Sequence, residues 1–414
     1  MYFYKLKNRV LISQNKHAGF EPISEKEAEK NKDILFILSR REPLKSRRSF
    51  CIADTSLFFM KEEGINLLKK ERKVKNRLPV WLEKRIKDKK LCMINLEYPK
   101  WQEVLTFKIP SKWRIHIAGL GDVGGMLLIG LRLLGGNYIK SIGIFDRNKQ
   151  VMTRWELEAN QVFSPFTMKK FPPVYPVIKK NIFDCDIFIF CATIGVPTLG
   201  REKSDVRMAQ FKGNSRIISD YAQRAREKSF KGIFAVVSDP VDLLCKQVFL
   251  ASNKNKKGQL DLMGLAPEQI RGYGLGVMNA RAVYHASLNN KTASYIREGR
   301  AFGPHGDGLI IVNSMKKYNE KISEQLTKQA LKANLDIRKT GFKPYIGPAL
   351  SSGSLSILAT IRKQWHYSAT FLGGVFMGAK NRLHHSGIEI ERLNFSPVLM
   401  RKINDTYQKL NILL

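Results

Sequence analysis

The chain has 414 residues, of which 43% are hydrophobic and 26% charged, so it is long enough for two or three domains with substantial cores and is not typical of a disordered protein. Its 71 basic and 36 acidic residues give a net charge of +35, but the excess is spread along the chain and does not by itself indicate a nucleic-acid site. No stretch has the roughly 20 uninterrupted apolar residues of a membrane span, and no signal peptide is recognisable. Five scattered cysteines indicate neither a disulfide framework nor a CxxC metal site, so we expect a cytoplasmic protein.

Residues 1–112 contain short apolar runs at 33–39, 91–96 and 104–109 between charged, helix-like segments. This pattern predicts a small α+β extension, to which the sequence assigns no role. Its densest basic run, at 69–90, could bind a polyanion with Trp81 as a stacking surface. A solvated helix face is the favoured interpretation, so nucleic acid is not an expected partner.

The segment 113–146 has the order of elements that a dinucleotide site requires. An apolar strand leads into Gly119-Leu-Gly121-Asp-Val-Gly124, then a helix-like stretch, then a second apolar strand that ends at Asp146. Gly119 permits a tight turn, Gly121 a close approach of the backbone to a pyrophosphate, and Gly124 close packing of helix on strand. Because Asp146 can accept hydrogen bonds from the ribose hydroxyls and would repel a 2′-phosphate, we expect NAD as the cofactor.

Beyond this turn, strands alternate with helices. The runs 184–191 and 233–237 are continuously apolar, as strands buried on both faces of a parallel sheet are, and 206–228 has helical spacing between them. The fold class is therefore α/β, a doubly wound parallel sheet of the Rossmann type over 113–268. The mixed pattern of 269–414 predicts an α+β substrate domain.

Three further segments carry a resemblance to a known family. They are Ser238-Asp239-Pro240-Val241-Asp242, Met278-Asn279-Ala280-Arg281 and Gly303-Pro304-His305-Gly306-Asp307. In order and spacing they resemble the Asn-Pro-Val-Asp, Asp-x-x-Arg and Gly-Glu-His-Gly-Asp motifs of the lactate/malate dehydrogenase family, and residues 113–414 resemble that family throughout. The resemblance implies NAD-dependent oxidation of an anionic 2-hydroxy acid, a homo-oligomer, and a mobile loop at 196–207.

The chemistry of such a site requires a cation for the substrate carboxylate and a proton donor for the carbonyl. The resemblance assigns the carboxylate clamp to Arg281, because a planar guanidinium binds a carboxylate through two hydrogen bonds. His305 would exchange the hydroxyl proton, since imidazole titrates near neutral pH. Arg207 would stabilise charge on the carbonyl oxygen. Surface salt bridges for the arginines and a turn position for His305 are the alternatives.

Three more residues are candidates for substrate contacts. Asn214 follows the loop on the next helix, and Ser351 falls in a small polar segment on the substrate side, although a helix N-cap would also explain it. Arg201 precedes Arg207 by the spacing that the paired loop arginines of malate dehydrogenases have. A malate-like substrate is therefore an open possibility beside a lactate-like one, and so is a solvated loop charge.

The motifs depart from the family at three positions. Met278 replaces the carboxylate that partners the catalytic histidine, Asp239 replaces the asparagine near the nicotinamide, and Pro304 replaces the glutamate before His305. Without an anion nearby, the imidazolium of His305 is less stable and a poorer proton donor. Our hypothesis is that Asp239 pairs with His305 and supplies that anion from another direction.

The remaining histidines suggest no metal site. His366 lies between Trp365 and Tyr367 and is expected to be packed, and His384 and His385 have no carboxylate or cysteine at ligand spacing. Two alternatives to the enzyme stay open. One is an NAD-binding regulator or inactive relative, and the other is a basic protein that interacts with nucleic acid.

Overall fold

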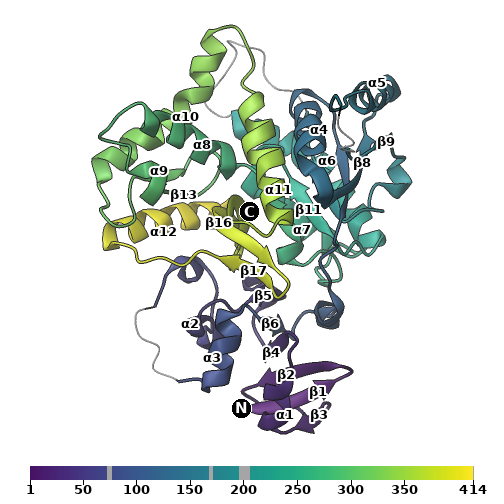
Figure 1. Cartoon of the computed structure of the whole chain (residues 1–414), viewed down its shortest axis with the longest axis vertical. Helices are drawn as coiled ribbons and strands as arrows, with labels where there is room; N and C mark the ends of the chain where they lie inside the picture. The colour runs from purple at the N-terminus through teal and green to yellow at the C-terminus, as the bar shows by residue number, and fades with distance from the viewer. Residues whose placement is uncertain (72–76, 167–170, 195–205, 414) are drawn as a thin grey trace.

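The structure is a computed structural model that describes residues 1–71, 77–166, 171–194 and 206–413, with the backbone alone for 206–209. Over these residues the chain folds into an N-terminal domain and a larger body around a nine-stranded sheet (Figure 1). No helix in these ranges is both long and apolar enough to cross a membrane.

The N-terminal domain is built on a mixed six-stranded sheet in the order β3-β1-β2-β4-β6-β5. Its strands are β1 (Tyr2–Leu6), β2 (Arg9–Ser13), β3 (Glu21–Ile23), β4 (Leu35–Ser39), β5 (Ser49–Cys51) and β6 (Leu91–Asn95). Its helices are α1 (Glu25–Lys30), α2 (Thr55–Phe59) and α3 (Val80–Lys87), with short 3₁₀ turns at Pro43–Lys45, Ile65–Leu68 and Trp101–Thr106. Strands β2, β4 and β6 run parallel.

The basic run 69–90 is not one helix. Within its described part, only α3 is α-helical. Trp81 donates a hydrogen bond to the Glu25 carboxylate at 2.9 Å and its ring lies 6.1 Å from that of Phe3. The solvated helix face that we favoured therefore corresponds to α3 alone in the described part of the run, and Trp81 is held against the domain core.

The second domain is the doubly wound sheet that the sequence predicts. Six parallel strands lie in the order β9-β8-β7-β10-β11-β12. They are β7 (Trp113–Ala118), β8 (Ile139–Phe145), β9 (Val174–Pro176), β10 (Ile187–Phe190), β11 (Ile233–Val236) and β12 (Ile270–Gly272). The helices are α4 (Asp122–Gly135), α5 (Lys149–Asn160), α6 (Val206–Glu227) and α7 (Val241–Ser252), with 3₁₀ turns at Gly136–Tyr138, Lys179–Asn181 and Pro267–Gln269. The chain reverses its winding between β7 and β10, which is the switch point where such sheets bind ligands.

The sheet does not stop at the boundary expected at residue 268. Strand β12 pairs antiparallel with β15, and β15, β16 and β17 continue the same sheet as a meander. The C-terminal part comprises α8 (Leu275–Ser287), α9 (Tyr295–Glu298), β13 (Arg300–Phe302), β14 (Ile310–Val312), α10 (Glu320–Lys339), the π-helix η7 (Pro348–Ser354), α11 (Leu355–Ile361), β15 (His366–Leu372), β16 (Val375–His384), β17 (Gly387–Ile390) and α12 (Pro397–Ile412).

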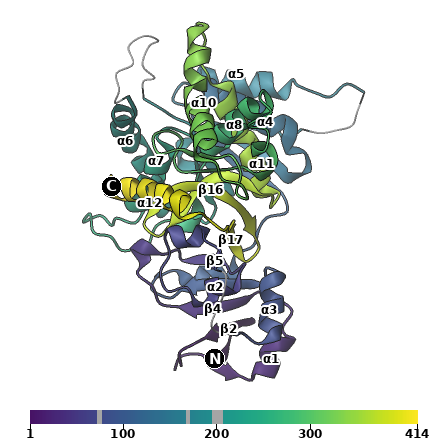
Figure 2. The same ribbon diagram turned by 90° about the vertical axis from the view of Figure 1, so that its left-hand side faces the viewer.

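The N-terminal domain docks on the far edge of this sheet, where β17 faces β5 (Figures 1 and 2). Gly387 has φ +113°, and a Cβ there would lie 2.9 Å from the backbone nitrogen of Cys51, so the two segments approach through a glycine. Arg48 and Ser49 both bind one carboxylate oxygen of Glu268, at 3.0 and 3.1 Å. These buried polar contacts fix the domain at a distance from the switch point.

Candidate active site

The glycine turn lies at the switch point, between β7 and α4. Gly119 has φ +94°, and a Cβ there would lie 2.6 Å from the backbone nitrogen of Ala192 after β10. A Cβ on Gly124 would collide with the carbonyl oxygen of Gly119. By contrast, a Cβ on Gly121 would meet no atom within 4 Å, so the backbone is open to a ligand at this residue.

The donors and acceptors around this turn fit a dinucleotide. Gly121 is the N-cap of α4, and no side chain caps the helix, so its first N–H groups can bind phosphate oxygens. The Asp146 carboxylate, at the end of β8, accepts backbone N–H groups of Leu120 at 2.9 Å and Asn148 at 3.0 Å. These bonds fix the carboxylate beside the turn and leave lone pairs for ribose hydroxyls.

The His305 imidazole and the Asp239 carboxylate lie within hydrogen-bond distance, as the hypothesis requires. The imidazole Nδ1 lies 3.0 Å from an Asp239 carboxylate oxygen, with 14% of the His305 side chain and 46% of the Asp239 side chain exposed. Asp239 lies three residues after the end of β11, and His305 lies three residues after the end of β13. The pair therefore stands at the carboxyl end of the parallel sheet, where its second ring nitrogen can meet a substrate.

Asp242 contacts the backbone of His305, a role that sequence reasoning did not predict. It lies in the first turn of α7, and its carboxylate accepts the backbone N–H of His305 at 3.4 Å. Burial, reinforced by the nearby Asp239 charge, raises the pKa of the Asp242 carboxyl to about 7, against the effect of the His305 and Gly378 N–H groups. Its other oxygen has no hydrogen-bond partner among the described residues.

The raised pKa of Asp242 makes a testable contribution to stability. The folded-state pKa of about 7 exceeds the unfolded value near 4, so this contribution is complete below about pH 4 and is lost as the pH rises to about 7. In Asp242→Asn this titration is absent. Between pH 5 and pH 8, the unfolding free energy of the variant should therefore rise by about 3 kcal/mol relative to the wild type. Urea denaturation of both proteins at pH 5 and pH 8 measures these free energies. A difference between variant and wild type that is the same at both pH values would contradict the prediction.

Arg281 lies on α8, half-buried between that helix and α10. Its Nη1 contacts the Met278 sulfur at 3.5 Å and the Ala330 carbonyl oxygen at 3.4 Å. Met278 itself is 1% exposed. The Met278 thioether, at the position where the motif resemblance leads us to expect a carboxylate, therefore contacts the Arg281 guanidinium.

Gly274, the N-cap of α8, sets the distance between that helix and His305. A Cβ there would lie 2.8 Å from the His305 Cβ and 3.0 Å from a Val241 methyl group. Gly274→Ala should therefore displace His305, destabilise the fold by about 1–3 kcal/mol and lower turnover about tenfold. Thermal unfolding and steady-state kinetics check this; unchanged turnover with an unchanged melting temperature would show that the contact is relieved without cost.

The structure places two of the predicted substrate residues, Asn214 and Ser351, and gives the first a positioning role. Asn214 is 0% exposed, and its amide accepts the Ile194 N–H and donates to the Asp239 carbonyl, each at 2.8 Å. A substrate contact of Asn214 stays a prediction, but these bonds hold the backbone of Asp239. Ser351 lies inside η7 and is not a helix N-cap. Its neighbour Ser352, which we did not predict, links α8 to η7 by accepting the Val277 N–H at 2.8 Å.

The two loop arginines cannot be placed. Arg201 and residues 196–205 of the expected mobile loop lie outside the described residues. Arg207 belongs to the first turn of α6, where the backbone alone is described.

The other histidines are explained by local contacts. His366 is 6% exposed and bonds Thr360 at 2.9 Å, which confirms that it is packed. His384 does have a carboxylate partner, because the β16–β17 hairpin brings Glu389 to 2.7 Å. The sequence pattern did not reveal this partner, since register across a hairpin is not visible as ligand spacing. The described residues contain no group of three or more His, Cys, Asp or Glu side chains that could hold a metal.

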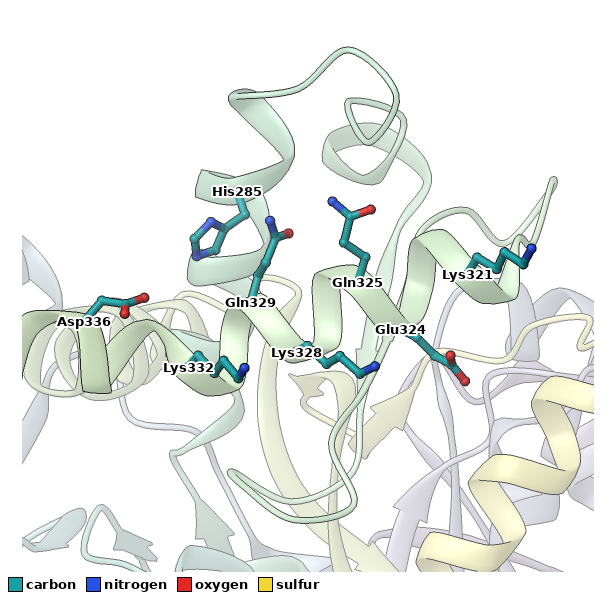
Figure 3. Close-up of a pocket in the computed structure, with 8 residues that line it drawn as sticks. All are labelled: His285, Lys321, Glu324, Gln325, Lys328, Gln329, Lys332 and Asp336. Carbon is teal, nitrogen blue, oxygen red and sulfur yellow. The ribbon is translucent and has the colours of Figure 1, made fainter. Parts of the chain in front are cut away.

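A groove of about 600 Å³ lies elsewhere, along α10 and the end of α8 (Figure 3). It is lined by His285, Lys321, Glu324, Gln325, Lys328, Gln329, Lys332 and Asp336. None of the predicted site residues lines it, and its walls are mainly the long, polar side chains of one helix. We therefore assign the active site to the switch point and not to this groove.

Comparison with known proteins finds lactate dehydrogenases among the relatives of the chain. No family model matches the chain. It is 25% identical over 242 residues to L-lactate dehydrogenase 2 of Listeria innocua, covering 56% of this chain and 71% of that enzyme. It is 26% identical over 208 residues to L-lactate dehydrogenase of Mycoplasma pneumoniae, covering 49% of this chain and 59% of that enzyme.

Solved structures extend the similarity to the fold. The chain matches the minor L-lactate dehydrogenase of Enterococcus mundtii with a TM-score of 0.59 and 17% identity, over 73% of this chain and 98% of that one. It matches the malate dehydrogenase of Cryptosporidium parvum with a TM-score of 0.56 and 16% identity, again over 73% and 98%. At these identities the structural matches establish a shared fold.

Proposed function

We infer that the chain is a divergent member of the lactate/malate dehydrogenase family, supported at low sequence identity, and we propose that it interconverts an anionic 2-hydroxy acid and its 2-oxo acid with NAD. The observation that carries the proposal is the 3.0 Å pair of His305 and Asp239 beside the open glycine turn. In a protein without catalytic activity, nothing would require Asp239 to supply His305 with the carboxylate that Met278 replaces.

The cofactor would be held by the glycine turn and Asp146. Gly121 and the N-terminus of α4 would take the pyrophosphate, and Asp146 the adenosine ribose. NAD, when bound, accepts or gives the hydride at its nicotinamide ring. The observations that support NAD binding here are the open backbone at Gly121 and the N-terminus of α4, which no side chain caps.

The protein's own side chains would manage the substrate and the proton. Arg281 would bind the substrate carboxylate in two-pronged geometry and so orient the carbonyl. With Nδ1 held by Asp239, His305 would give a proton from Nε2 to the carbonyl oxygen during reduction and take it back during oxidation. Asp239 stabilises the imidazolium and fixes the ring, while Asp242 and Asn214 position the two backbones.

The loop residues would complete the site. We propose that Arg207 stabilises charge on the carbonyl oxygen and that Ser351 borders the substrate. If Arg201 meets a second carboxylate, the substrate is malate-like, and otherwise it is lactate-like. The two cases differ in the ratio of kcat/KM for oxaloacetate and pyruvate.

The rival function is a cofactor-binding protein without turnover, which the loss of the carboxylate at Met278 favours. Titration of NADH followed by turnover on a panel of 2-oxo acids separates the two. Our proposal requires both binding and NADH consumption. Binding without consumption on any acid of the panel would support the rival, and absence of binding would exclude both.

We also propose that the protein is a homo-oligomer. Large apolar side chains that are more than half exposed lie on or beside α5, α8, α10 and α11, among them Leu157, Phe163, Leu288, Phe342 and Leu355. Such residues mark protein interfaces when they gather. Sedimentation should give a mass at least twice the 47.4 kDa of one chain, and a single-chain mass at micromolar concentration would contradict the proposal.

A further inference from the structure

The first residue of α4 is an acid in an unfavourable place for a phosphate site. Asp122 follows Gly121 directly, and its side chain is 53% exposed. A carboxylate at a helix N-terminus is stabilised by the same N–H groups and dipole that would attract a phosphate. If a pyrophosphate binds here, as the proposed function requires, Asp122 repels it unless a cation stands nearby.

Lys343, from the C-terminal part of the chain, supplies that cation. The ammonium group of Lys343 lies 3.2 Å from the Asp122 carboxylate, although the two residues are 221 positions apart. Lys343 belongs to the segment between α10 and η7, which passes beside α4 (Figure 1). The lysine therefore reaches from the C-terminal domain to the rim of the glycine turn.

The backbone that carries Lys343 is fixed to α4. The Lys343 carbonyl accepts the Tyr345 N–H at 3.0 Å, and the Tyr345 carbonyl accepts the Ala349 N–H at 3.0 Å as η7 begins. From η7, the Ser354 hydroxyl reaches the Leu127 carbonyl of α4 at 3.5 Å. Ser354 and Leu350 of η7 also pack closely against Gly130 of α4, so no room is left between η7 and α4. The position of Lys343 is thus set by packed structure on its C-terminal side.

The ion pair itself is suited to exchange. The Lys343 side chain is 65% exposed, and an ion pair so open to water contributes little to stability. A lysine side chain is long and flexible, and a pyrophosphate carries more charge than one carboxylate. An ammonium group so placed can exchange the Asp122 carboxylate for another anion by rotation of its own side chain.

We propose that Lys343 is a cofactor-binding residue, which pairs with Asp122 in the free protein and with the pyrophosphate of a bound dinucleotide. This inference rests on the proposed function. It assigns to the C-terminal domain a direct contact with the cofactor and explains how an acid is tolerated at the start of α4.

Dissociation constants of NADH, ADP-ribose and adenosine test the proposal. In Lys343→Gln, NADH and ADP-ribose should bind about tenfold more weakly, whereas adenosine, which lacks the pyrophosphate, should bind as before. Asp122→Asn should strengthen NADH binding, because it removes the repulsion. Lys339→Gln is the matched control, since Lys339 is exposed and pairs with Asp336 on its own helix at 2.9 Å.

The outcomes distinguish failure of the role of Lys343 from failure of the proposed function. If the wild type binds NADH and Lys343→Gln binds it equally well, the role of Lys343 is refuted while the proposed function stands. Equal weakening of adenosine and ADP-ribose would also refute it, because the pyrophosphate would not be the group recognised. If the wild type binds no NADH, the proposed function itself fails.

Discussion

Asp239→Asn should lower kcat for reduction of a 2-oxo acid by about a hundredfold, a loss of about 3 kcal/mol of transition-state stabilisation. The amide keeps the shape of the carboxylate but not its charge. The imidazolium of His305, 3.0 Å away, then loses the anion that stabilises it and orients the ring.

Steady-state rates of NADH consumption between pH 5.5 and 8.5 measure this effect. Asp184→Asn is a matched control, because it removes the same charge from an exposed residue just before β10, at the amino end of the sheet. A rise in turnover in Asp239→Asn would show that the carboxylate hinders the reaction. In that case the compensation between Met278 and Asp239 is refuted.

Arg281→Lys should lower kcat/KM for the 2-oxo acid by about a hundredfold. An ammonium keeps the charge but cannot form two parallel hydrogen bonds to a carboxylate, and its shorter reach also changes the contacts with Met278 and Ala330. Because the arginine orients the substrate, kcat should fall together with substrate affinity.

The control for this variant is Arg297→Lys, at an exposed arginine of the neighbouring helix α9. It should keep the wild-type kcat/KM. If Arg281→Lys and the wild type have equal kcat/KM, Arg281 does not bind the substrate carboxylate. Its role would then be limited to the contact between α8 and α10.

The fold was predictable because its signals are local. Continuous apolar strands such as 184–191, separated by helical spacing, define a parallel sheet without knowledge of any tertiary contact. The glycine turn is equally local, since Gly119 and Gly124 are required by conformation and packing within one strand–helix unit. The contact of Asp239 with His305 was predictable from one lost and one gained carboxylate.

What escaped prediction depends on contacts between distant segments. The burial of Asn214 and its bonds to Ile194 and to the main chain of Asp239 arise only when α6 packs against the segments that follow β10 and β11. The partner of His384 depends on hairpin register, and the docking of the N-terminal domain depends on pairs such as Arg48 and Glu268, 220 residues apart. Neither periodicity nor spacing along the chain carries such information.

We propose that this protein transfers hydride between a nicotinamide and the carbonyl carbon of a 2-oxo acid. The direct measurement is mass spectrometry of the product formed from NADH that carries deuterium at the transferred position, with pyruvate and oxaloacetate as substrates. We expect one deuterium at C2 of the 2-hydroxy acid from the wild type, and a strongly reduced yield from Asp239→Asn. Bound cofactor with no deuterated hydroxy acid from either substrate would contradict the account.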